Sequence, residues 1–137
     1  MLTKLFSSPV RVKILKFLIM HSPADFSASD IAVKTNSVVR SVNKEMGKLA
    51  GAGAVIEELK PLEVNKKIVK VKHYRANVDF ALFAEIKNIF IKLQVLELDD
   101  LQRKLHNIGR LNYAVLAGKF VGDASGSVDL LVVGKVD

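Results

Sequence analysis

The stretch from Ser37 to Leu49, SVVRSVNKEMGKL, constrains the fold of this chain more than any other. At helical spacing its apolar side chains fall on one side, which predicts a helix with a single apolar face. They are Val38, Val42, Met46 and Leu49. The opposite side carries Arg40, Ser41, Lys44 and Lys48. Such a helix can anchor in a core and present cations to a polyanion, but an ordinary amphipathic surface helix fits the same pattern. The neighbouring segments decide between these two interpretations.

A first helix is predicted over residues 9–20. Ser8 is a suitable N-cap, and Pro9 suits the first turn because its missing N–H has no helical acceptor there. The apolar stripe of this helix is formed by Val10, Ile14, Phe17 and Leu18. The sequence His21-Ser22-Pro23 then ends it.

A second, short helix is predicted over residues 28–34. Ser27 is followed three residues later by Asp30, which is a capping box with Asp in place of the usual Glu. Thr35-Asn36 is a polar turn of the length that joins two steeply crossing helices. Together with the basic helix that follows, this segment predicts a helix-turn-helix.

A β-hairpin is predicted after the basic helix, which ends at residues 50–53 because glycine tolerates the left-handed conformation that closes a helix. Residues 54–60 and 66–74 are rich in β-branched side chains and flank a predicted turn over residues 61–65. The second arm carries Lys66, Lys67, Lys70, Lys72 and Arg75. A solvated strand face explains such a charge run, but beside a helix-turn-helix the hairpin becomes a wing that can lie along a phosphate backbone.

The charge is concentrated in the first half of the chain. The net charge is +7, and residues 1–75 contain 14 Lys and Arg against 6 Asp and Glu. This asymmetry favours a polyanionic partner for the first half. There are no cysteines, and no apolar run is long enough to cross a membrane, so a cytoplasmic protein is expected. His21, His73 and His106 have no acidic or thiol companions at ligand spacing, so no metal or cofactor is expected.

Three segments of the first 75 residues resemble the ArsR-like regulators of bacteria and archaea. They are Ser29–Ala32, Arg40–Leu49 and Ala52–Val55, which look like the second helix, the recognition helix and the closing segment of that family. The resemblance implies a recognition helix in the major groove of duplex DNA and a wing on the flanking backbone.

The resemblance also implies a set of DNA-binding residues. Asn36, Ser37, Arg40, Ser41 and Lys44 would face base edges or nearby phosphates, and Lys48, Lys66, Lys67, Lys70 and Lys72 would contact phosphates. Arg40 is the best candidate for direct readout, because a guanidinium can pair bidentately with guanine; a phosphate contact is the alternative role of this residue.

Residues 79–98 predict a long helix with an unusually wide apolar surface. Only Glu85, Asn88 and Lys92 form a polar stripe. One small domain cannot hide so much apolar surface, so this helix is expected to pack against a second copy of the chain or a second domain. An ordinary core helix is the alternative. A further short helix is predicted over residues 99–106.

The last segment changes character, with strands predicted over residues 113–117 and 128–133. Together with residues 74–92, the sequences Leu116–Lys119 and Ser127–Gly134 resemble the start of a small nucleotidyltransferase-like domain that is fused to winged helices. In that family a Gly-Ser pair is followed by Asp-x-Asp, whose carboxylates hold a metal ion. Here Lys119 replaces the Ser and Ser127 replaces the first Asp, which leaves only Asp129. We therefore expect no catalysis. Two strands alone do not form a domain, so an end at Asp137 is typical of a fragment, and the residues do not say whether more chain follows.

The sequence thus predicts a mainly α chain with a small β-hairpin, a winged helix-turn-helix, followed by an α/β nucleotidyltransferase-like fragment. The expected divisions are residues 1–76 for DNA binding, 77–109 for a helical connector and dimerisation segment, and 110–137 for the partial α/β region. The expected function is transcriptional regulation by a homodimer that binds double-stranded DNA and no membrane. The alternatives are a nucleotidyltransferase with the winged helix as a targeting module, and a winged helix used only for protein contacts.

Overall fold

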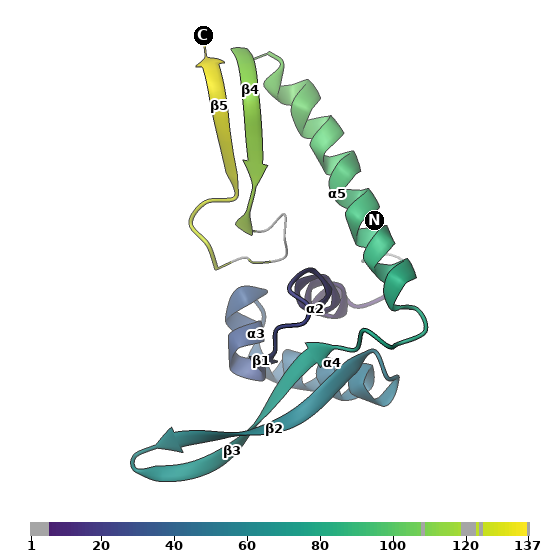
Figure 1. The fold of residues 1–137 in the computed structure, drawn as a ribbon, viewed down its shortest axis with the longest axis vertical. Helices are drawn as coiled ribbons and strands as arrows, with labels where there is room; N and C mark the ends of the chain where they lie inside the picture. The colour runs from purple at the N-terminus through teal and green to yellow at the C-terminus, as the bar shows by residue number, and fades with distance from the viewer. Residues whose placement is uncertain (1–5, 108, 119–122, 124, 137) are drawn as a thin grey trace.

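The computed structural model describes residues 6–107, 109–118, 123 and 125–136. Within these ranges, three helices and a three-stranded sheet form a compact N-terminal body, and a long helix leads from it to a two-stranded hairpin at the other end of the molecule (Figure 1). The elements are α2 (Pro9–Met20), β1 (Phe26–Ser27), α3 (Ala28–Lys34), α4 (Val39–Gly51), β2 (Val55–Val64), β3 (Lys67–Ala76), α5 (Phe83–Leu105), β4 (Gly109–Leu116) and β5 (Leu130–Val136).

The first two predicted helices are confirmed residue by residue. The Ser8 hydroxyl accepts a hydrogen bond from the Arg11 N–H at 3.2 Å and caps α2. At α3 both halves of the capping box are present, since Ser27 accepts from the Asp30 N–H at 3.2 Å and Asp30 accepts from the Ser27 N–H at 3.4 Å. These bonds satisfy N–H groups that a helix cannot satisfy internally, which fixes where each helix begins.

The basic helix α4 is shifted by two residues from its prediction. Val38 is its N-cap, has an extended backbone and is 69% exposed, so the prediction that Val38 belongs to the apolar face is wrong. The other predicted apolar positions are buried, and Glu45 joins them. At its end, Gly53 has φ +82°, and the N–H groups of Gly53 and Ala54 donate to Ala50 and Leu49, both at 3.0 Å. This is a Schellman motif, as the glycines predicted.

The wing is a hairpin with a tighter turn than predicted. The sheet order is β1-β3-β2, all antiparallel, and Val64 pairs with Lys67 across a two-residue turn. Asn65 and Lys66 both have positive φ, at 50° and 63°, as a type I′ turn requires. The prediction of a turn over residues 61–65 is wrong, because Pro61 lies within β2 opposite Lys70. Proline is tolerated there because β2 is an edge strand.

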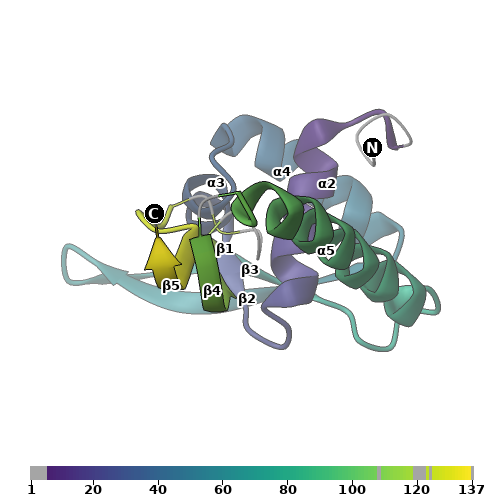
Figure 2. The ribbon, with the colours of Figure 1, turned by 90° about the horizontal axis from the view of Figure 1, so that it is seen from above.

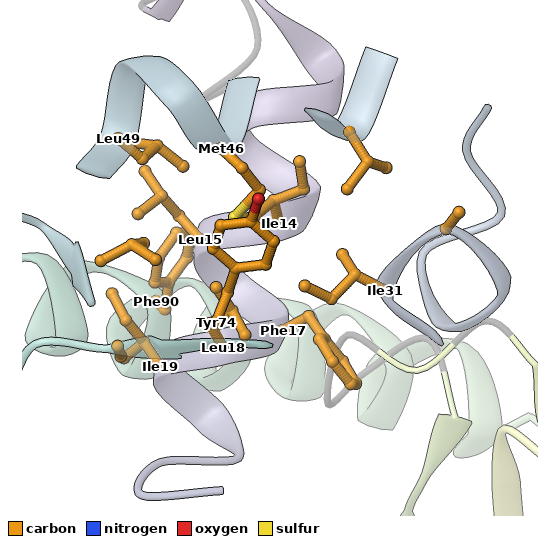
Figure 3. Packing of buried hydrophobic residues seen from close by; sticks show 14 residues of the cluster. Ile14, Leu15, Phe17, Leu18, Ile19, Ile31, Met46, Leu49, Tyr74 and Phe90 are labelled. Atoms are coloured by element: carbon orange, nitrogen blue, oxygen red, sulfur yellow. The ribbon is translucent and has the colours of Figure 1, made fainter. Parts of the chain in front are cut away.

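The core lies where the three N-terminal helices meet the base of the sheet (Figure 3). Its fully buried side chains are Ile14, Phe17, Leu18, Ile31, Val42 and Met46. Tyr74 from β3 and Phe90 from α5 are also buried, at 5% and 4% exposure. The core therefore draws on every element of the N-terminal body and on the first half of α5.

The connector is one continuous helix rather than two. The predicted break between residues 98 and 99 is wrong, because no Gly or Pro interrupts α5. Lys104 and Asp100 also form an i,i+4 ion pair at 2.8 Å across its last turns. Seen from above, α5 crosses α2 (Figure 2), and Phe83, Ile86, Phe90 and Leu93 of its first half pack against the core. Other apolar side chains of α5 are exposed, namely Ile89, Ile91, Val95, Leu96 and Leu98.

The last two strands form an antiparallel hairpin beside the far half of α5 (Figure 1). β4 begins four residues earlier than predicted, and β5 begins two residues later and extends to Val136. In the described part of the chain, an ion pair between Lys34 Nζ of α3 and Asp123 Oδ2 at 3.0 Å connects the C-terminal region to the N-terminal body. Hydrogen bonds from the Ser125 side chain and from Lys34 lower the pKa of Asp123 to about 2. Among the described residues, no helix is long and apolar enough to cross a membrane.

Candidate nucleic-acid interface

The turn between α3 and α4 sets the angle of the basic helix. Thr35 is 2% exposed, and its hydroxyl donates to the Ile31 carbonyl at 2.7 Å. Asn36 adopts φ +50°, which asparagine tolerates better than most residues, and is exposed. Ser37 donates from its N–H to the Ala32 carbonyl at 2.8 Å, and its hydroxyl bonds to Thr35. Of the two predicted contact residues in this turn, Asn36 is open to solvent and Ser37 is committed to the turn.

The outward side of α4 is opposite its buried side. Arg40 and Lys44 are exposed one turn apart, and Gly47 and Gly51 continue the same stripe. A Cβ added at either glycine would meet nothing within 4 Å. The first half of the stripe therefore offers cations, and the second half offers bare helix backbone that a bulky partner can approach closely.

A buried ion pair fixes the rotation of α4 about its axis. Glu45 is 7% exposed, and its carboxylate accepts a hydrogen bond from Arg11 Nε of α2 at 2.8 Å. Burial raises the pKa of Glu45, but the hydrogen bond and charge of Arg11, with Lys48 at 3.9 Å, outweigh it and bring the net pKa below its usual value. Because Glu45 is held inward, Arg40 and Lys44 are held outward.

The wing lysines do not share one surface. Side chains alternate along a strand, so Lys70 and Lys72 lie on the strand face of buried Tyr74, whereas Lys67 lies on the opposite face. Lys66 occupies the turn at the tip. Lys70 and Lys72 therefore lie on the side of the helices, and Lys66 and Lys67 lie at the far end of the wing.

A groove of about 650 Å³ lies between α3, the start of α4 and the wing. Its walls include Lys70 and Lys72 from the wing and Val39 and Asn43 from α4. Asp30 is the one carboxylate among the lining residues, and it is engaged in the capping box of α3. Val39 and Asn43 are not among the contact residues predicted from the sequence. The helical period alone could have placed them beside Arg40, but only the wing position shows which flank of α4 lines a groove.

The candidate cations differ in how far they are neutralised. Lys72 pairs with Glu57 at 3.0 Å, which raises the pKa of Lys72, and Lys48 lies 3.9 Å from Glu45. Within the part of the chain that the structure describes, five candidate cations form no ion pair: Arg40, Lys44, Lys66, Lys67 and Lys70. Ser41 is half-buried on the flank of α4 away from the groove.

Comparison with known proteins supports the fold. No protein-family model matches the chain, and no curated protein matches it. Among solved structures, the chain is similar to the adhesin competence repressor (AdcR) of Streptococcus pyogenes, with a TM-score of 0.53 and 14% sequence identity over 75% of this chain and 72% of that one. The fold is therefore that of a winged-helix protein, as predicted, whereas the ArsR-like assignment and the nucleotidyltransferase-like region stay predictions.

Proposed function

We propose that this chain is a transcriptional regulator that binds duplex DNA through α4 and the wing. The observation that carries the proposal is the placement of Arg40, Lys44 and Lys70, which are exposed and form no ion pair within the described residues. Arg40 and Lys44 lie on the outward side of α4, and Lys70 lies across the groove from Asn43. A basic helix beside a basic strand suits the major groove and the adjacent phosphate backbone. The repressor function of the structurally similar AdcR is in keeping with this proposal.

The salt dependence of binding tests this proposal. Each lysine or arginine that neutralises a phosphate releases counterions, so the slope of log K against log salt steepens by about 0.9 per contact. We therefore expect fluorescence anisotropy with a labelled random-sequence duplex, at several salt concentrations, to give a slope whose magnitude is smaller by about 1 in Lys44→Ala and in Lys70→Ala.

Lys92→Ala is the matched control, because Lys92 is an exposed cation on α5 and forms no ion pair within the described residues. It should leave both the affinity and the slope unchanged. Equal effects of Lys92→Ala and Lys44→Ala would show that binding depends on net charge alone, and would remove α4 as the contact surface.

We further propose that the regulator is a homodimer joined through α5. The supporting observation is the set of five exposed apolar side chains between Ile89 and Leu98. A dimer would place two copies of α4 on successive half-sites of one DNA face. Light scattering should give twice the 15.1 kDa of one chain, and Val95→Glu/Leu96→Glu should return it to one chain. A single-chain mass for the unmodified protein at micromolar concentration would refute this arrangement.

We also propose that the C-terminal region does not transfer nucleotides. Gly118 and Asp129 lie side by side, since an added Cβ on Gly118 would clash with the Asp129 carboxylate, and both residues match the motif of the nucleotidyltransferase-like family. However, Lys119 and Ser127 stand where the resemblance expects Ser and Asp. Incubation with labelled nucleoside triphosphates and Mg²⁺ should leave the protein and duplex DNA unlabelled. Transfer of label would favour the enzyme alternative.

A further inference from the structure

We propose that the groove-facing flank of α4, formed by Val39 and Asn43, reads an A·T-containing step in the DNA. This inference rests on the proposed DNA-binding function and deepens it, because it assigns base recognition to two residues that are not cationic. The two residues lie one helical turn apart on the same flank, and both line the groove that separates α4 from the wing.

The amide of Asn43 is free for a ligand. Asn43 is exposed and forms no hydrogen bond with any described part of the protein. An asparagine side chain offers one donor and one acceptor at the spacing of adenine N6 and N7, which is the pairing that the major groove presents for adenine. Asn43 lies in the first half of α4, the part of a recognition helix that contacts base edges.

Val39 is 41% exposed in the first turn of α4, where it contributes little to the core. A β-branched residue is also a mediocre choice for this position, and the preceding N-cap, Val38, makes no side-chain capping bond. Local folding rules are therefore broken at the start of α4, as is common at functional sites. An exposed valine beside a base-reading amide suits the C5-methyl group of thymine, the one apolar feature of the major groove.

The spacing of the two residues fits base pairs that lie one or two steps apart. Residues four apart in a helix lie about 6 Å apart along its axis, which is within two base-pair steps of 3.4 Å. Arg40 and Lys44 occupy the neighbouring outward stripe. The expected division of roles is that the cations set affinity and the groove-facing flank sets sequence preference.

Selection from a random duplex library, followed by sequencing, tests the role of Asn43. The unmodified protein should enrich a motif that contains an invariant adenine, and Asn43→Ala should lose that one position. Asn43→Ala should bind the best duplex about 5- to 150-fold more weakly, with an unchanged salt slope. Alanine favours helix and Asn43 forms no bonds within the described residues, so the variant should fold; circular dichroism checks this.

A thymine-to-uracil substitution tests Val39 separately. Replacing each thymine of the selected motif by uracil removes only the methyl group, and one position should weaken binding of the unmodified protein by several-fold. The same replacement should not affect Val39→Ala. The inference is overturned if Asn43→Ala selects the same adenine, or if the unmodified protein binds duplexes without sequence preference. Failure of the unmodified protein to bind any duplex would instead overturn the proposed function together with this inference.

Discussion

The ion pair between Arg11 and Glu45 gives the sharpest test of how α4 is positioned. Arg11→Met keeps the apolar stem of the side chain and removes the guanidinium, which leaves a carboxylate that is 7% exposed, with Lys48 at 3.9 Å and the Ser8 hydroxyl as its remaining partners. A hydrogen bond between charged groups contributes about 1.5 to 3 kcal/mol to the free energy of unfolding. Because the substitution also leaves a buried carboxylate without its main partner, the free energy of unfolding should fall by about 3 kcal/mol. For a chain of 137 residues this corresponds to a Tm lower by roughly 10 °C.

The double-mutant cycle isolates the pair from the burial of its members. Glu45→Leu should cost less than Arg11→Met, because Arg11 is 29% exposed and reaches water once it loses its partner. The double variant Arg11→Met/Glu45→Leu should recover most of the loss, with a coupling free energy of about 2 kcal/mol by urea denaturation. The single variants should also weaken duplex binding, because α4 can rotate when Glu45 is no longer held.

The pH dependence provides the internal check. The folded-state pKa of Glu45 is lowered, so its stabilisation is complete above the ordinary carboxyl pKa and is lost as pH falls through the folded value. The difference in stability between the unmodified protein and Arg11→Met should therefore be full near pH 7 and shrink below about pH 4. A coupling below about 0.5 kcal/mol at pH 7, or one that does not change with pH, would refute the assignment of this pair as the anchor of α4.

Three further outcomes are expected. Phe90→Ala should lower the free energy of unfolding by about 3 to 5 kcal/mol by urea denaturation, because Phe90 is 4% exposed and fastens α5 to the core; a loss below about 1 kcal/mol would contradict that role. Gly47→Ala should raise thermal stability by about 0.5 to 1 kcal/mol, since its Cβ meets nothing within 4 Å, and should weaken duplex binding if DNA approaches the bare backbone there; calorimetry and anisotropy measure the two effects. Asp123→Asn should destabilise the protein at pH 7 but not below about pH 2. The pKa of Asp123 is lowered in the folded protein, so its carboxylate stabilises the fold above the ordinary carboxyl pKa and stops doing so when it is protonated near pH 2. An equal effect of the substitution at both pH values would show that the ion pair with Lys34 contributes nothing to stability.

Local signals in the sequence determined the helices of the N-terminal body. Ser8 and Ser27 each accept a hydrogen bond from a backbone N–H three residues later, and Gly53 adopts the positive φ that ends α4. These effects are local, so they do not depend on distant contacts. The confirmed limits of α2 and α3 follow from this. Local preference does not decide residues 61–65. The sequence predicts a turn that includes Pro61, but cross-strand pairing with Lys70 outweighs the local preference of proline on an edge strand.

Only the tertiary structure decided which side of each element faces a partner. Charge and helical period predicted that Arg40, Lys44 and the wing lysines share an interface. However, side chains alternate along β3, so Lys67 and Lys70 lie on opposite faces of the hairpin, and the pairing register of β2 with β3 decides which face is turned toward the helices. Asn43 was missed because its neighbours across the groove come from β3, about 30 residues later in the chain. Helix caps and turns depend on residues that are adjacent in the sequence, whereas a groove forms only when distant segments pack together. This is why the sequence predicted the elements of the fold but not which residues line the groove.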